Sequence, residues 1–263
     1  MKGVAQMEKG KQQETSFESI GLSQREFFTL FLLQTLSKEP NYPRAIHDEL
    51  NVSFTGKVHS YDYLCKTARQ LAGSGHLELY AENGKKYYKI TNKGKELFTW
   101  YRDNFSERFK EVKAVIDRVM YDLTGTGVNP PVVRELPEEY RSYFSKIVSV
   151  KDLVRYVTLR AASKSKRIYM GEIAELLKTK FGWIASNGYL YDLSHEMEEG
   201  SLLNGYWESE KRTKRYLQIT EEGHHHYKQI ADSAAFQVRE VQKYLGNVLA
   251  FLEGKELISQ EGN

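Results

Sequence analysis

A faint internal repeat, spaced by about 127 residues, constrains the fold more than any other feature of the 263-residue chain. One segment and a following leucine occur twice, as Tyr42-Pro43-Arg44-Ala45-Ile46 with Leu50 and as Tyr169-Met170-Gly171-Glu172-Ile173 with Leu177. A second pattern also recurs, as Tyr87, Ile90-Thr91 and Gly94 and then as Tyr216, Ile219-Thr220 and Gly223. Self-similarity at a fixed period predicts two copies of one supersecondary arrangement.

Each copy predicts three helices. Ser23 with Glu26, and Ser149 with Asp152, are N-cap signals with an acidic residue in the first turn. The first helix of the first copy has one apolar face, formed by Phe27, Leu30, Phe31 and Leu33. A short second helix follows, and a third is expected at 60–72 in the first copy and 187–199 in the second.

A two-stranded hairpin is predicted after each third helix. In the first copy, alternating runs at 77–80 and 86–90 flank Asn83-Gly84, a strong hairpin signal. In the second copy the strands are expected near 202–207 and 215–219. Three helices followed by a two-stranded wing form a winged helix. We therefore expect a mainly α fold with small β wings (α+β), with two winged helix-turn-helix units, each followed by a long amphipathic helix.

The domain organisation follows from this pattern. We expect a flexible tail at 1–21, a first winged-helix domain with its C-terminal helix at 22–123, a linker rich in Gly and Pro at 124–137, and a second domain at 138–263. Apolar residues in both long helices recur at steps of three and four, typical of a seam that packs on a partner helix. We expect a homodimer through the C-terminal helices, with a pseudo-dimer of the two units within one chain as the alternative.

Other sequence features narrow the class of protein. Cys65 is the only cysteine, no CxxC pair or apolar run of membrane-spanning length occurs, and the N-terminus lacks a signal-peptide pattern. These observations favour the cytoplasm and no membrane partner. No catalytic motif is present, so we expect no enzyme and no cofactor. His224-His225-His226 point about 100° apart on a helix, so no metal site is expected.

Three short motifs resemble those of the PadR-type transcriptional regulators. These are Tyr87-Tyr88-Lys89-Ile90-Thr91-Asn92-Lys93-Gly94, Met170-Gly171-Glu172-Ile173-Ala174 and Leu190-Tyr191. The resemblance implies a winged DNA-binding domain and C-terminal helices that dimerise, although typical members carry one winged domain and this chain carries two. It also suggests a small aromatic effector, for which the candidate pocket residues are Trp100, Tyr101, Trp183, Tyr206 and Trp207.

The two copies differ in charge from the third helix through the wing. Residues 57–95 carry eight cations against three anions, a net charge of +5, whereas 183–225 carry four against eight, a net charge of −4. Because neutralisation of phosphates dominates DNA affinity, we expect the first copy to make the main contacts with DNA. Its candidate contacts, at the start or outer face of the third helix and on the wing, are Ser60, Tyr61, Tyr63, Lys66, Thr67, Lys85 and Lys86. The second wing offers Lys211, Arg212, Lys214 and Arg215.

We therefore expect a sequence-specific transcriptional regulator, acting as a repressor, that binds double-stranded DNA. One alternative is a replication or partition protein of a plasmid or phage, which would bind directly repeated sites. Another is a winged-helix protein-interaction module without DNA binding, favoured by the acidic third-helix face of Asp192, Glu196 and Glu199 in the second copy.

Overall fold

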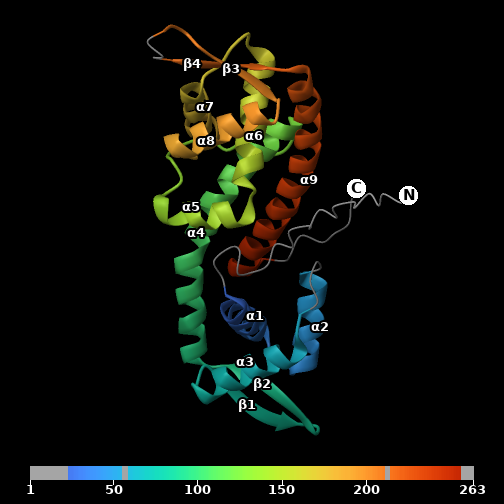
Figure 1. Ribbon diagram of the computed structural model, residues 1–263. Helices are drawn as coiled ribbons and strands as arrows, with labels where there is room; N and C mark the ends of the chain where they lie inside the picture. The colour runs from blue at the N-terminus through green and yellow to red at the C-terminus, as the bar shows by residue number, and fades with distance from the viewer. Residues whose placement is uncertain (1–22, 55–58, 211–213, 256–263) are drawn as a thin grey trace, which may run out of the picture.

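A computed structural model describes residues 23–54, 59–210 and 214–255, and these are mainly helical with two small antiparallel sheets (Figure 1). The first half contains α1 Gln24–Lys38, α2 Pro43–Ser53, α3 Tyr61–Gly73, β1 Leu77–Glu82, β2 Lys85–Ile90 and α4 Asn92–Thr124. The second half contains α5 Glu138–Ile147, α6 Val150–Lys164, α7 Met170–Leu176, the π-helix η2 Leu177–Phe181, α8 Asn187–Glu199, β3 Leu203–Trp207, β4 Arg215–Ile219 and α9 Glu221–Leu252. We call α1–α4 the first repeat and α6–α9 the second repeat.

The first helix of each repeat begins where its N-cap signal predicts. The Ser23 hydroxyl accepts a hydrogen bond from the Glu26 amide, and the Glu26 carboxylate accepts one from the Ser23 amide at 2.8 Å, which completes a capping box. Ser149 caps α6 in the same way, through the Asp152 amide. The prediction of a single apolar face on α1 is wrong, because all ten residues from Phe27 to Leu36 are buried. Other elements therefore surround α1 on every side.

The hairpins have the expected register. β1 pairs with β2 from Leu77 opposite Ile90 to Glu82 opposite Lys85. Asn83 and Gly84 connect the strands with φ values of 49° and 72°, as a type I′ turn requires. β3 pairs with β4 in the second repeat. One isolated bridge in each repeat joins the second strand to the residue two positions before the second helix, between Asn41 and Tyr88 and between Ile168 and Leu217.

The recurring Ile-Thr-x-x-Gly pattern fastens each long helix to the start of its hairpin. The Thr91 hydroxyl accepts from the Gly94 amide at 3.1 Å, and it lies within hydrogen-bond distance of two carbonyl oxygens, at 2.8 Å from that of Gly75 and 3.0 Å from that of His76. A side chain at Gly94 would overlap that carbonyl and lie 2.7 Å from Ile90 Cγ1. In the second repeat, Thr220 and Gly223 make the same contacts, with Leu202 in the place of His76. The repeat in the sequence is thus a repeat of hydrogen bonding and close packing.

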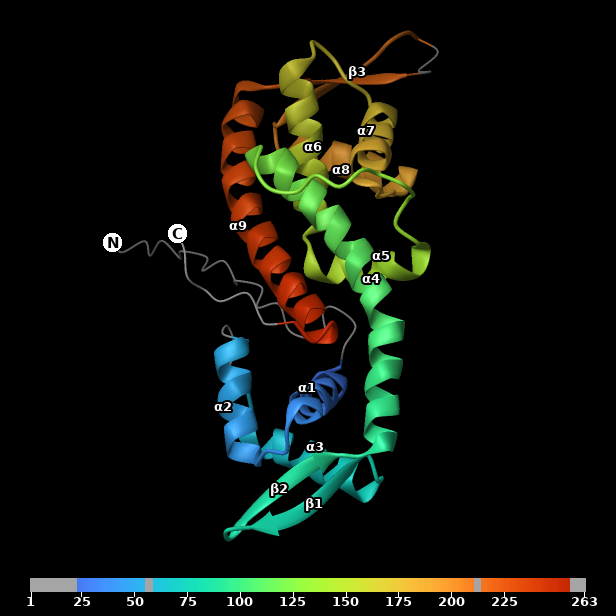
Figure 2. The same cartoon turned by 180° about the vertical axis from the view of Figure 1, so that it is seen from behind.

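The two long helices, α4 and α9, pack side by side and run in opposite directions, with the hairpins at opposite ends of the molecule (Figures 1 and 2). Each long helix ends on the first helix of the other repeat. Phe251 near the end of α9 stacks on Phe31 of α1, with ring centroids 5.2 Å apart. Asp122 near the end of α4 accepts a hydrogen bond from Tyr156 of α6 and forms an ion pair with Arg160.

The apolar seam of α9 is consequently covered within one chain. Its buried residues at the contact are Val238, Val241, Leu245, Val248, Leu249, Phe251 and Leu252. The expectation that this seam holds a homodimer therefore finds no support, because the seam already has α4 and α1 as its partners.

Of the segment 124–137, expected as a linker, Thr124 is the last residue of α4, and 125–137 have no helix or strand but are attached to their surroundings. Leu136 is buried and its amide donates to the Gly182 carbonyl at 2.7 Å. Arg118 of α4 donates to the Pro131 carbonyl at 3.0 Å. The helix that follows, α5, was not predicted. The expected tail at 1–21 lies outside the described residues, and no described helix is long and apolar enough to cross a bilayer.

Candidate nucleic-acid interface

Three candidate residues, Ser60, Tyr61 and Lys66, are exposed at the start of α3. Ser60 is the N-cap, and its hydroxyl accepts from the Tyr63 amide at 3.3 Å. The exposed Tyr61 ring lies 5.7 Å from the guanidinium carbon of Arg44 on α2. Lys66 is exposed one turn further along the helix. A cation from α2, an aromatic ring and a cation from α3 therefore share this end of the first repeat.

Two candidates on α3 do not lie on its outer face. Thr67 is 2% exposed, and its hydroxyl donates to the Tyr63 carbonyl at 2.9 Å. Tyr63 is half-buried, with its ring 5.3 Å from that of Phe28. The prediction that Thr67 lies on the outer face is wrong, because the stripe of α3 that packs on α1 is broader than Leu64, Ala68 and Leu71 alone. Thr67 belongs to the packing of α3.

The first hairpin carries Lys85 and Lys86, both exposed, beside a group of three tyrosines. Tyr80 and Tyr87 are cross-strand neighbours whose stacked rings lie 5.7 Å apart, and Tyr42 meets Tyr87 edge-on at 5.6 Å. The Lys85 ammonium lies 4.7 Å from the Tyr42 ring centroid. This cation–π contact restrains the ammonium near the N-terminus of α2.

The second repeat has the same tyrosine group, which sequence reasoning missed. Tyr206 and Tyr216 are cross-strand neighbours, and Tyr169 meets Tyr216 edge-on at 6.2 Å. The Lys214 ammonium lies 3.7 Å from the Tyr169 ring centroid. The signal was available, because Tyr42 and Tyr87 recur as Tyr169 and Tyr216 in the repeat itself.

Charge distinguishes the two hairpins. In the part of the chain that the structure describes, Lys66, Lys85 and Lys86 have no carboxylate within ion-pairing distance. Arg215 of the second hairpin instead forms an ion pair with Glu198 of α8, its Nε 3.2 Å from Glu198 Oε1. Lys214 is partly buried, and Lys211 and Arg212 lie outside the described residues. The two hairpins thus differ at the position of Lys86, where the second repeat has the neutralised Arg215, whereas Lys214, at the position of Lys85, has no carboxylate partner among the described residues either.

The acidic face expected on α8 is also partly neutralised. Glu196 accepts a hydrogen bond from Lys151 of α6 at 2.6 Å and forms an ion pair with Arg155. The Lys151 contact, followed by the charge of Arg155, lowers the pKa of the Glu196 carboxyl group. Asp192 and Glu199 remain exposed.

The five aromatic residues suggested for an effector pocket do not gather in one place. Trp183 is buried against Phe144 of α5, with ring centroids 5.9 Å apart. Trp100 is exposed on α4, and Trp207 and Tyr206 are partly exposed on β3. Tyr101 lines a cavity in the first repeat.

Comparison with known proteins gives no assignment, since no protein-family model matches the sequence and no curated protein is significantly similar to it. Within the described ranges, no three His, Cys, Asp or Glu side chains gather in a way that could hold a metal ion. Functional inference therefore depends on the geometry and charge described above.

Proposed function

We propose that this protein is a sequence-specific DNA-binding transcriptional regulator, with two winged helix-turn-helix units similar to those of PadR-type regulators. The observation that carries the proposal is the first hairpin, whose exposed Lys85 and Lys86 have no carboxylate partner among the described residues. Unpaired cations on a protruding hairpin suit contact with DNA phosphates, because each neutralised phosphate releases counterions.

The proposed binding surface consists of the α3 N-terminus and the first hairpin. In the winged-helix arrangement, the third helix enters the major groove and its first residues reach base edges. Ser60, Tyr61 and Lys66 are the α3 residues that remain available for this role. Lys85 and Lys86 would hold flanking phosphates, which fixes the register of the protein on the duplex.

A single chain would supply both units of the regulator. The antiparallel packing of α4 and α9 joins the two repeats in the way that a dimer of single-unit chains would join its subunits. We therefore favour the pseudo-dimer over a homodimer through the C-terminal helices. Sedimentation velocity of the free protein tests this choice, with one chain expected as the predominant species and a dimer as the contrary result.

Fluorescence anisotropy tests the function. Labelled duplexes from around the protein's own coding locus are titrated at several salt concentrations, against shuffled duplexes of equal composition. We expect selective binding, with an affinity that falls steeply as salt rises. Replacing both hairpin lysines (Lys85→Glu/Lys86→Glu) should weaken binding by about tenfold or more and reduce the salt slope by about 2.

The contrary result is weak binding that is equal for both sets of duplexes and unchanged by the double variant. Binding only to directly repeated sites would instead favour a replication or partition protein. A matched control is Lys146→Glu/Lys228→Glu, which reverses the charge of two exposed lysines in the second half of the chain that form no ion pair among the described residues, and which should leave DNA affinity nearly unchanged.

A further inference from the structure

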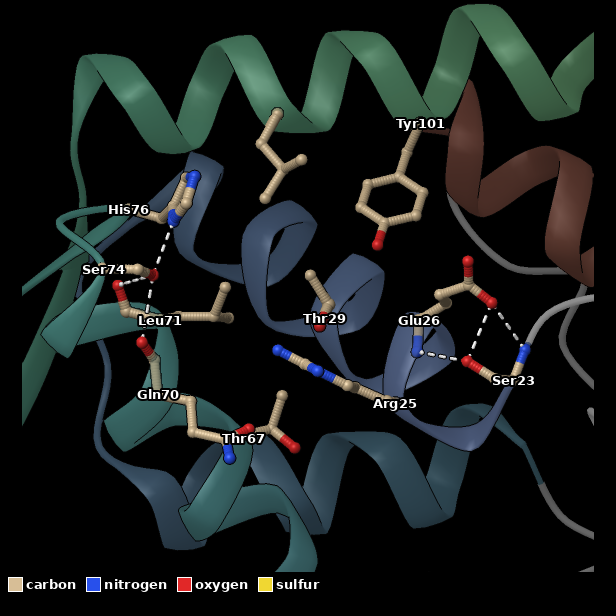
Figure 3. Close-up of a pocket in the computed structure, with 11 residues that line it drawn as sticks. Ser23, Arg25, Glu26, Thr29, Thr67, Gln70, Leu71, Ser74, His76 and Tyr101 are labelled. Atoms are coloured by element: carbon tan, nitrogen blue, oxygen red, sulfur yellow. Dashed lines mark hydrogen bonds between the residues drawn. The ribbon is translucent and has the colours of Figure 1, made fainter.

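A polar cavity of about 540 Å³ lies in the first repeat, between α1, α3 and α4 (Figure 3). Ligand pockets commonly have volumes of about 300–1,000 Å³, so it is large enough for a small molecule. The polar residues that line it include Arg25, Thr29, Gln70, Ser74, His76 and Tyr101.

The second repeat explains why this space is open. α1 and α6 have equal length and align end to end, Gln24 with Val150 and Lys38 with Lys164, so that Thr29 corresponds to Arg155 and Arg25 to Lys151. α3 and α8 also have equal length, and in the same alignment Gln70 corresponds to Glu196.

In the second repeat, these positions form a closed ion cluster. Lys151 and Arg155 both contact the Glu196 carboxylate. In the first repeat, Thr29 stands in the place of Arg155, and Gln70 stands in the place of Glu196. Arg25, in the place of Lys151, keeps the positive charge. The cavity therefore lacks the carboxylate that its counterpart supplies internally.

Two groups that line the cavity, the Arg25 guanidinium and the Tyr101 hydroxyl, can donate hydrogen bonds to a ligand. Arg25 has no carboxylate within ion-pairing distance among the described residues, and Figure 3 shows its side chain extending between Thr29 and Gln70. Tyr101 is 8% exposed, and its hydroxyl points into the cavity with no hydrogen-bond partner in the described structure. A hydroxyl that faces an open cavity is free to donate a hydrogen bond to an acceptor on a ligand.

Glu26 also lines the cavity, but its carboxylate is engaged in the cap of α1. Glu26 accepts hydrogen bonds from the Ser23 amide and hydroxyl, both at 2.8 Å, in the cap of α1. Burial, followed by the negative charge of Glu26, raises the pKa of the Tyr101 hydroxyl, so this group is a proton donor at neutral pH.

We propose that this cavity binds a small, polar organic acid, whose carboxylate pairs with Arg25 and accepts a hydrogen bond from Tyr101. Arginine suits this role because its planar guanidinium can donate two parallel hydrogen bonds to a carboxylate. Thr29, Gln70 and Ser74 suit hydroxyl or further carboxyl groups on the same acid. Control of DNA binding by such an acid would rest on the proposed function, but the site itself does not.

Isothermal titration calorimetry of the full chain tests the site, with succinate, malate and citrate as probes at constant ionic strength and without DNA. At least one acid should bind, and Arg25→Gln should weaken that binding by about tenfold or more, as expected for the loss of a charged hydrogen bond. The double variant Thr29→Arg/Gln70→Glu rebuilds the ion cluster of the second repeat and should abolish binding. Lys151→Gln removes the corresponding cation there and should leave the affinity unchanged.

Two results would overturn the proposal: no heat of binding with any of the three acids, or affinity that Arg25→Gln and the double variant leave intact. Because Arg25 is exposed, its replacement should preserve folding, so the test does not depend on the double variant alone. DNA affinity measured separately distinguishes failure of this site from failure of the proposed regulator function.

Discussion

Replacing Gly94 with alanine tests whether the Ile-Thr-x-x-Gly pattern fastens the long helix to the hairpin. Gly94 lies in the first turn of α4, against the His76 carbonyl, and its φ is not positive. Any loss of stability would therefore come from the added methyl group rather than from backbone strain. The new Cβ would lie 2.7 Å from Ile90 Cγ1 and closer still to the His76 oxygen.

The magnitude follows from three contributions. Overpacking of this kind costs about 1–3 kcal/mol. Moving the His76 carbonyl weakens its hydrogen bond from the Thr91 amide, at 3.1 Å and worth about 1 kcal/mol, while the Thr91 hydroxyl keeps its nearer acceptor, the Gly75 carbonyl at 2.8 Å. Alanine in a helix returns about 0.8 kcal/mol relative to glycine. We expect a net loss of about 1–3 kcal/mol in the free energy of unfolding.

Urea unfolding followed by circular dichroism measures this loss. With a slope of about 3 kcal/mol per molar urea, the midpoint should fall by about 0.3–1 M. Gly188→Ala is the matched control, because Gly188 lies in the first turn of α8 with nothing within 4 Å of an added Cβ. It should leave the midpoint unchanged or raise it slightly. Equal midpoints for the two variants would refute the reasoning about Gly94.

Two further predictions concern the buried end of α4. Asp122, whose side chain is 3% exposed, pairs with Arg160 and Lys180, so Asp122→Asn should lower the free energy of unfolding by about 2–3 kcal/mol, because Lys180 is half exposed and retains hydration. Glu107→Gln, which removes an exposed pair, should cost less than about 1 kcal/mol in the same urea assay, and equal losses would contradict the burial argument. Burial, followed by the charge of Asp122, raises the pKa of Tyr156, so the folded state keeps a proton that the unfolded state releases above about pH 10. Stability should therefore fall as pH rises above about 10, and Tyr156→Phe should make that fall shallower. An unchanged pH dependence would show that Tyr156 does not contribute.

Local patterns in the sequence predicted the elements well because short-range rules govern them. The N-caps at Ser23 and Ser149 and the Asn83-Gly84 turn depend only on neighbouring backbone groups, and the structure confirms all three. α8 begins and ends at the residues expected for the third helix of the second repeat.

Long-range packing could not be predicted in the same way. The burial of α1 on every side depends in part on α9, whose Phe251 packs on Phe31 although the two residues are more than 200 positions apart in the chain. Thr67 is buried because α1 covers it, and no local pattern shows that. α5 was missed because its apolar face is short, with Phe144 and Ile147 as its buried residues.

The candidate site was predicted in part. Charge counts identified the first hairpin, because formal charge can be read directly from residues. The pairing of Arg215 with Glu198 required the structure, since β4 and α8 approach each other only in the folded chain. The Arg25 cavity likewise required the structure, since α1, α3 and α4 approach one another only in the folded chain.

The central claim is that the first hairpin, and not the second, contacts DNA. Its most direct test compares Lys85→Glu with Lys214→Glu, two lysines that occupy the same place against Tyr42 and Tyr169. Salt-dependent anisotropy with a selectively bound duplex should show that Lys85→Glu weakens binding by about tenfold and reduces the salt slope by about 1 or more, while Lys214→Glu changes neither. Equal effects of the two variants, or a larger effect of Lys214→Glu, would contradict the account.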